Sequence, residues 1–223
     1  EPAPVTIFGV ALPRAAVEEA ARQPPRAMLV NPPAAAAQLA LALAQRDPGN
    51  PVGTVLGEVQ ALPYASGLGG PSNAFAAHLR SSRPLLDCDE RALFAASLVQ
   101  ALPPDRRLLR LGKTSVPVRR AALLHMPRYV HALLLLGLIS LPRGYEGPAL
   151  VAEDIVYVPV EMTRTAAPGV FDREGRALLL DPTGEWSLDD GASVQPLRGA
   201  LRPSRGPSAL LVQEREREAV RGQ

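Results

Sequence analysis

A mixed α/β (α+β) fold, with a β-rich core of short strands and flanking helices, is what the sequence predicts. Hydrophobic residues make up 47% of the 223 positions, which is enough for a sizeable core. The 24 prolines and 18 glycines argue against a long helical bundle and favour short elements joined by turns. Because aromatic residues are only 4%, Leu, Val and Ala must form most of that core.

The first half of the chain alternates predicted strands and helices. β-branched and apolar runs indicate strands at 5–12, 27–30 and 52–61. Alanine- and leucine-rich runs indicate helices at 14–23, 34–45 and 72–80, the last capped by Ser72. The clearest helix covers 87–101, because Asp87 or Asp89 can cap it and its apolar residues follow a 3.6-residue period.

The second half is predicted to be richer in strands. Short strands are expected at 108–111 and 115–118, and a longer one at 149–162, interrupted at Pro159. The apolar segment 129–141 is either a buried strand pair or a core helix, which periodicity does not separate. We expect a main α+β domain over 1–167. The remainder, 168–223, is expected to hold a hairpin at 171–180, an Arg/Pro-rich linker and a charged helix at 210–220.

Charge and cysteine content exclude several classes of protein. The net charge is +2 and the arginines are spread along the chain, so nucleic acid is not expected as a partner. Cys88 is the only cysteine, so no internal disulfide can form. No apolar run is long enough to span a bilayer, and no signal peptide is recognised at Glu1. A soluble intracellular protein, in the cytoplasm or nucleus, is the expectation.

The few residues with catalytic potential are scattered. His78, His125 and His131 lack metal-site spacing, so no metal or cofactor is expected. We interpret His78 as a surface residue, His125 as a residue near a turn and His131 as a core residue. Cys88 lies between two aspartates, which would raise its thiol pKa. The Gly-Lys-Thr at 112–114 lacks the first glycine of a phosphate-binding loop. Ser115 is a possible nucleophile with two histidines downstream. Paired acids such as Asp189-Asp190 are interpreted as solvated.

Several short motifs follow one another in a recognisable order over residues 5–144. They are VTIFGVAL at 5–12, a helix at 15–21, MLVN at 28–31, VGTVL at 52–56, SNAF at 72–75, Leu-Pro at 102–103 and YVH at 129–131. This order resembles the maturation-protease fold shared by herpesvirus capsid proteases (assemblins) and tailed-phage prohead proteases. The resemblance implies peptide cleavage by a Ser-His-His triad.

Carried onto this sequence, the resemblance assigns Ser115 as nucleophile, His131 as base and Arg143 as support for the oxyanion. Prolines stand after Asn31, where the family has its first histidine, and no serine closely follows Pro103. The resemblance therefore implies a degenerate serine peptidase site. The expected function is a structural or capsid-assembly component, virion-associated or intracellular, that forms oligomers and has weak or absent protease activity.

Two alternatives stay open. The chain could be a non-enzymatic interaction module that binds a protein partner through segment 129–141 and its Arg/Pro-rich tail. It also resembles dUTPase-like proteins, through GLIS at 137–140 and GYEG at 144–147, although the family's aspartate is replaced by Ser140 or lost.

Overall fold

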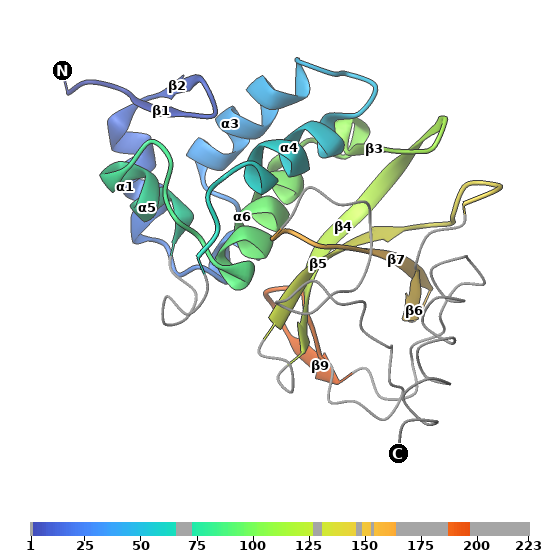
Figure 1. Ribbon diagram of the computed structural model, residues 1–223. Coiled ribbons are helices and arrows are strands. Elements are labelled where there is room, and N and C mark those ends of the chain that lie inside the picture. Colours follow the sequence, from blue (N-terminus) through green and yellow to red (C-terminus); the bar gives the residue numbers. More distant parts are fainter. Residues whose placement is uncertain are drawn as a thin grey trace, which may run out of the picture.

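Helices dominate the first hundred residues and strands dominate the rest, and the two parts pack as layers (Figure 1). The computed structural model describes residues 2–65, 73–126, 131–145, 149–152, 154–163 and 187–196. Over these residues the mixed α+β class predicted from sequence is confirmed. None of the helices they form combines the length and the apolar character needed to cross a membrane.

The helical layer opens with a small hairpin and continues through six helices. Strands β1 (Val5–Ile7) and β2 (Val10–Leu12) pair with each other in a two-stranded sheet. The helices are α1 (Arg14–Arg22), α2 (Ala27–Val30), α3 (Ala34–Ala44), α4 (Pro51–Gln60), α5 (Ala74–Arg80) and α6 (Cys88–Ala101). A short 3-10 helix, η1 (Pro104–Arg106), leads into the strands.

Of the three strand predictions in this layer, the first is confirmed as two strands instead of one, and the other two are wrong. Segment 5–12 is a hairpin, because Phe8 and Gly9 both have positive φ and reverse the chain. Segment 27–30 is a single helical turn, α2, since an apolar run of four residues does not distinguish the two states. Segment 52–61 is helix α4, which Asn50 caps by accepting a hydrogen bond from the Gly53 backbone N–H.

The predicted helices at 14–23, 34–45 and 87–101 are confirmed within a residue or two of their ends. The helix predicted at 72–80 begins later, and Asn73 rather than Ser72 caps it. Asp87 and Glu90 form a reciprocal capping box at the start of α6. Helix α6 lies between α3 and α4 on one side and strands β4 and β5 on the other (Figure 1).

The main sheet is antiparallel. Its strands are β3 (Leu108–Leu111), β4 (Thr114–Met126), β5 (His131–Leu138), β6 (Leu150–Ala152), β7 (Ile155–Val160), β8 (Ser187–Asp189) and β9 (Val194–Pro196). Their order is β6-β7-β5-β4-β8-β9, and β3 pairs with β4. Segment 129–141 contributes one central strand, β5. The interruption expected at Pro159 is absent, because Pro159 lies beyond the part of β7 that pairs with β6.

The region 168–223 contributes to this same sheet. Strand β8 pairs with β4, and β9 pairs with β8, so residues 187–196 extend the sheet of the main domain. The hairpin predicted at 171–180, the linker at 198–207 and the helix at 210–220 lie outside the described residues.

A buried arginine joins the two layers. Arg91 of α6 is 1% exposed and donates to the backbone carbonyls of Leu62, after α4, and Met162, after β7. Its guanidinium also stacks over the Tyr64 ring at 5.3 Å. Burial lowers the pKa of Arg91 from its ordinary value. These contacts offset most of the cost of removing the Arg91 charge from water, and they hold the end of β7 against the helices.

Two motifs that carry the maturation-protease resemblance do not have the expected structure. Segments 28–31 and 52–56, which the resemblance places in strands, fall mainly in helices α2 and α4. The first strand pair belongs to its own two-stranded sheet rather than to the main one. The central place of β5 in the main sheet does agree with the position expected for segment 129–141.

Candidate functional site

The predicted pair of Ser115 and His131 is not brought together. Ser115 is exposed on β4, and its hydroxyl donates to the Gly49 carbonyl at 2.7 Å. His131 pairs with Met126 at the opposite end of the same strand. The backbone from Ser115 to Met126 is extended and spans roughly 30 to 36 Å. These strand positions are too far apart for direct proton transfer between the two residues, so the predicted catalytic pair is corrected.

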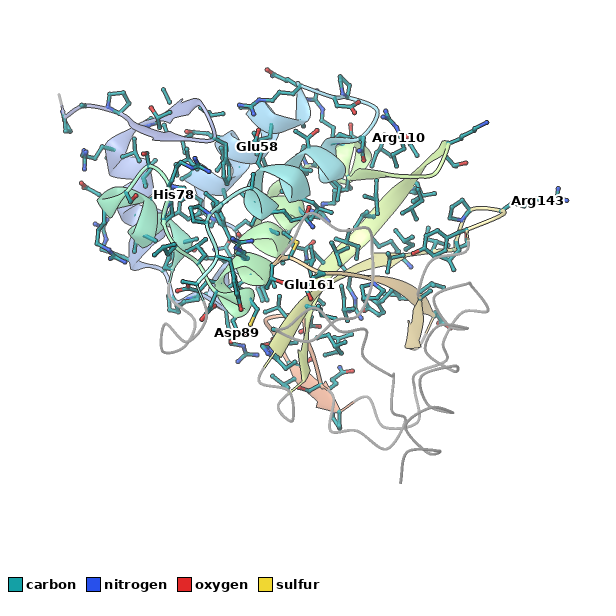
Figure 2. The ribbon with its side chains drawn as sticks, in the orientation of Figure 1. Glu58, His78, Asp89, Arg110, Arg143 and Glu161 are labelled. Atoms are coloured by element: carbon teal, nitrogen blue, oxygen red, sulfur yellow. The ribbon has the colours of Figure 1, made fainter. Side chains whose placement is uncertain are left out.

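Arg143 lies on the Ser115 side of the sheet, far from His131. It is exposed in the turn that follows β5 (Figure 2). Together with Lys113 and Tyr145 it lines a shallow pocket of about 350 Å³. Lys113 belongs to the β3–β4 hairpin turn, where Gly112 supplies a φ of 63°. The Gly-Lys-Thr segment therefore leads into a strand, and the helix that a phosphate-binding loop requires does not follow it.

A different group of polar side chains meets at the other end of β4. Asp189 of β8 accepts from Arg26 Nε at 2.7 Å and from Arg26 Nη2 at 2.8 Å. The Gly191 backbone N–H donates to the same carboxylate at 2.8 Å. His125 Nε2 lies 3.4 Å from Asp189 Oδ2, and the two side chains are 33% and 3% exposed. Asp189 was expected to be solvated, and its burial corrects that interpretation.

The electrostatics of Asp189 follow from these partners. Burial is the largest influence and by itself raises the pKa of the carboxyl. The hydrogen bonds from Arg26 and Gly191, with the charges of Arg26 and His125, outweigh it, so the pKa of Asp189 lies below its ordinary value. Asp189 is therefore a permanent anion at neutral pH, held between the start of α2 and strand β4.

The strand register places further groups on the Asp189 face of the sheet. Directly paired residues of antiparallel strands point to the same side. Ser187 pairs with His125, Asp189 with Val194 and Ser187 with Pro196. Since residues two apart on a strand share a face, the side chains of all five lie on the side where Asp189 meets Arg26.

Two exposed apolar residues accompany this polar group. Val30 ends α2 and is 59% exposed, and Val194 of β9 is 53% exposed. A Cβ atom added at Gly191, in the β8–β9 turn, would lie 2.9 Å from Val30 Cγ2. The turn therefore packs directly against the end of α2. We call the surface formed by Arg26, Val30, His125, Val194 and Pro196 the α2–β9 face.

A second cluster of potential ligands lies at the start of α6. One ligand atom from each of Asp87, Cys88 and Asp89 falls within 4.8 Å of the others. Asp87 already accepts the Glu90 backbone N–H in the capping box. Cys88 is buried, and its thiol lies 3.7 Å from an Asp89 oxygen. The arrangement is accounted for by helix capping, and we assign no metal to it.

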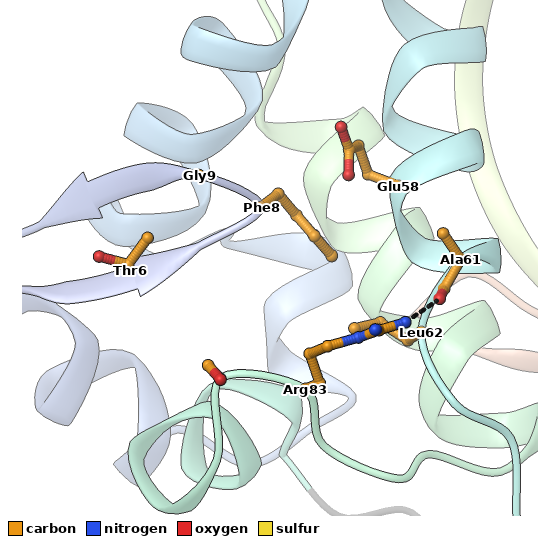
Figure 3. Close-up of a pocket in the computed structure, with 8 residues that line it drawn as sticks. Thr6, Phe8, Gly9, Glu58, Ala61, Leu62 and Arg83 are labelled. Atoms are coloured by element: carbon orange, nitrogen blue, oxygen red, sulfur yellow. Dashed lines mark hydrogen bonds between the residues drawn. The ribbon is translucent and has the colours of Figure 1, made fainter.

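A pocket of about 330 Å³ opens in the helical layer (Figure 3). Its wall includes Phe8 from the β1–β2 turn, Glu58 from α4 and Arg83 from the loop before α6. His78, interpreted from sequence as a surface residue, is instead 3% exposed and contacts the Phe8 ring. Burial lowers the pKa of His78 to about 4, so this imidazole is neutral near pH 7.

Local sequence patterns do not reveal the contact between Arg26 and Asp189 or the burial of His78 beside the pocket. The contact between Arg26 and Asp189 joins residues 163 positions apart, and no short motif connects them. A partial signal exists for His78, which follows Phe75 by three positions and therefore shares the buried side of a helix. Comparison with family models, curated proteins and solved structures identifies no match to this chain.

Proposed function

We propose that this protein is a structural component that self-assembles through the α2–β9 face. The observation that supports the proposal is the exposure of two valines, Val30 at the end of α2 and Val194 at the start of β9, beside the Gly191 turn that packs on α2. Among the described residues, the large apolar side chains that stay exposed are those two with Leu85 and Ile139. Exposed apolar residues that gather on one surface are typical of protein interaction sites.

The face has the composition of a small protein interface. Its apolar part is Val30, Val194 and Pro196, and its border is formed by the Arg26–Asp189 ion pair and the one-third-exposed His125. Apolar centres with polar borders are usual at such interfaces. The packing of Gly191 on α2 holds the hairpin in place, so little ordering would be needed on association.

Side chains, rather than backbone pairing, are proposed to make the contact. Strand β9 lies at the end of the strand order, next to β8. Pro196 has no backbone N–H, and proline at a sheet edge opposes the addition of another strand. The proposed contact therefore joins copies through Val30 and Val194 and leaves the sheet of each copy separate.

The resemblance to capsid maturation proteases supports an assembly role of this kind inside an infected cell. The proposal does not need catalysis, and the separation of Ser115 from His131 removes the pair from which protease activity was expected. The partner in this proposal is a second copy of the same chain.

Light scattering after size-exclusion chromatography tests the proposal. The full chain is expected to give a mass above that of one copy, rising with concentration. Val30→Asp and Val194→Asp place a charge in the contact and should return the protein to one copy. Leu85→Asp and Ile139→Asp change equally exposed apolar residues elsewhere and should leave the mass unchanged. A monomer at every concentration, or equal effects of all four variants, would overturn the proposal.

A second candidate function is supported by one specific arrangement. Ser187 lies directly opposite His125, whose imidazole is 3.4 Å from the buried Asp189 carboxylate. A hydroxyl, an imidazole and a carboxylate on one face are the groups of a serine hydrolase. In that chemistry the Ser187 oxygen would attack the acyl or phosphoryl centre while its proton passes to His125, which returns that proton to the departing group. Water would then cleave the acyl- or phosphoryl-serine and restore the hydroxyl.

A fluorophosphonate probe tests this second function. Attack by the serine oxygen on phosphorus displaces fluoride, and the probe stays bound to the serine. The hydrolase proposal expects labelling that Ser187→Ala and His125→Gln abolish and that Ser115→Ala leaves intact. Labelling lost only in Ser115→Ala would instead support the assignment of Ser115. No labelling of the wild-type chain would exclude an activated serine.

A further inference from the structure

An aromatic cluster lies beneath the 330 Å³ pocket of the helical layer. Phe8 contacts His78 with ring centroids 5.7 Å apart, and both rings contact Phe94, at 6.0 and 5.8 Å. Phe75 completes the cluster at 5.2 Å from Phe94. The whole chain has four phenylalanines, and three of them meet in this cluster, where Phe94 contacts both other phenylalanines and His78. Such a concentration in an aromatic-poor protein distinguishes this place from the rest of the core.

The residue that separates the pocket from the histidine is held in a strained conformation. Phe8 has a φ of 52°, and among the described residues it is the one non-glycine with positive φ. That backbone conformation is unfavourable for a residue with a Cβ, because the Cβ crowds the following carbonyl oxygen. Asparagine, aspartate or glycine is preferred at this turn position. Strained residues of this kind cluster at ligand sites, and Phe8 lines the pocket (Figure 3).

The histidine behind Phe8 has unused hydrogen-bonding groups. His78 is 97% buried, and neither ring nitrogen has a hydrogen-bond partner among the described residues. Leaving buried polar atoms unpaired is unfavourable, because they lose their hydrogen bonds to water without replacement. Figure 2 shows His78 inside the helical layer. A ligand group that reached the imidazole would recover part of this cost.

The charges at the mouth of the pocket favour an anion. Glu58 is paired with Arg46, which also donates to the Phe8 carbonyl. Arg83 is exposed, and the one hydrogen bond of its guanidinium among the described residues is a long contact of 3.5 Å to the Ala61 carbonyl (Figure 3). Its guanidinium retains donors that match a carboxylate.

We propose that this pocket binds a small hydroxylated aromatic carboxylic acid, with Phe8 as a movable plug. The carboxylate contacts Arg83, the aromatic ring takes the place of the Phe8 ring beside Phe94, and the hydroxyl donates to a His78 ring nitrogen. The cavity lies within the size range of small-molecule sites. This site lies in the helical layer, apart from the α2–β9 face, and does not depend on the assembly proposal.

Calorimetric titration of the full chain with 4-hydroxybenzoate tests the inference. Benzoate and phenol each lack one of the two polar groups and are expected to bind at least about fivefold more weakly. Arg83→Gln should weaken 4-hydroxybenzoate by about tenfold or more. Arg80→Gln removes the same charge from the exposed end of α5 and should have no effect.

The His78→Phe variant distinguishes binding inside the pocket from binding at the surface. It keeps an aromatic ring in the core but removes the ring nitrogens, so 4-hydroxybenzoate should bind no better than benzoate. In the wild type, the imidazole carbon signals of His78 should shift in NMR spectra on titration. Absence of binding at millimolar concentrations would overturn the inference. Binding that Arg83→Gln does not alter, or that leaves the His78 signals unmoved, would also overturn it.

Discussion

Arg26 and Asp189 lie 163 positions apart in the chain, yet Arg26 donates to both oxygens of the Asp189 carboxylate at 2.7 and 2.8 Å. This paired contact links the residue that precedes α2 to strand β8, and so joins the helical layer to the edge hairpin of the sheet. Because Asp189 is buried while Arg26 is half exposed, the two partners are not equivalent. Loss of the arginine leaves a buried charge without its main partner.

Arg26→Gln is therefore expected to destabilise the protein by about 1–3 kcal/mol, a range that allows for screening at the exposed arginine. Asp189→Asn should cost a similar amount, and the double variant should cost less than the sum. Chemical denaturation of the four proteins measures this coupling. Arg14→Gln, which removes an exposed ion pair with Glu18, should change stability by no more than about 0.5 kcal/mol. Additive effects of Arg26 and Asp189 would contradict the contact.

Gly191→Ala should be one of the more damaging single-methyl changes. The residue has a φ of 88°, and a Cβ there would lie 2.7 Å from Leu29 Cβ and 3.0 Å from the Arg26 carbonyl. Strain and the clash together should lower the free energy of unfolding by roughly 2–4 kcal/mol. Gly112→Ala is the matched control, since its φ is 63° but nothing lies within 4 Å of the new Cβ. It should lose only about 1 kcal/mol. Thermal denaturation would show the difference, and equal losses would argue against the packing of Gly191 on α2.

Asp87→Ala should weaken the start of α6. It removes the side chain that accepts the Glu90 backbone N–H at 3.0 Å, half of the capping box. The expected loss is about 1 kcal/mol in the free energy of unfolding, measured with urea. Asp89→Ala changes an acid in the same turn that does not cap the helix and should lose about 0.5 kcal/mol or less. A larger effect at Asp89 would contradict the assigned cap.

Stability should fall below pH 6.5 because of His78. Its pKa is about 4 in the folded protein, against an ordinary 6.5 in the unfolded chain. Above pH 6.5 both states are neutral at this residue, so its contribution is constant. As the pH falls from 6.5 to 4, the unfolded chain gains a proton that the folded protein does not accept. The free energy of unfolding should decrease by up to about 3 kcal/mol over this range.

The comparison with His78→Phe isolates this contribution. Asp189 also loses stabilising charge in acid, since its folded pKa lies below the ordinary value, but it does so equally in both proteins. The difference between wild type and variant should therefore change between pH 6.5 and 4 and be constant at higher pH. A difference that does not vary with pH would mean that His78 is accessible to water in the folded protein.

Several elements were predictable because their signals lie within a few adjacent residues. The α6 helix is marked by Asp87 and Glu90 at capping-box spacing and by its apolar stripe. The β3–β4 hairpin has Gly112 at its turn. The α4 helix also carried a readable signal, since Val52, Val55, Leu56 and Val59 follow helical spacing, although the β-branched residues favoured a strand. There the side-chain propensity favours a strand and the periodicity favours a helix. The packing of this segment against α6 favours the helix.

The site residues were less predictable. Ser115 and His131 are 16 positions apart, a distance that suits a contact in many folds, but the β4–β5 register directs them to opposite ends. His78 carries a titratable ring that usually favours the surface, and only the packing of α5 and the β1–β2 hairpin encloses it. The α2–β9 face combines residues from three regions of the chain.

Taken alone, the order of amino acids determined the helices α1, α3 and α6 and the β3–β4 turn at Gly112, because these depend on backbone propensity and on side chains a few positions apart. Which charges are buried and which hydroxyl faces which imidazole depend on strand register and on the packing of helices against the sheet. Those are long-range contacts, and their free energies exist only once distant segments meet. In this protein, such long-range contacts join Arg26 to Asp189 and Phe8 to His78.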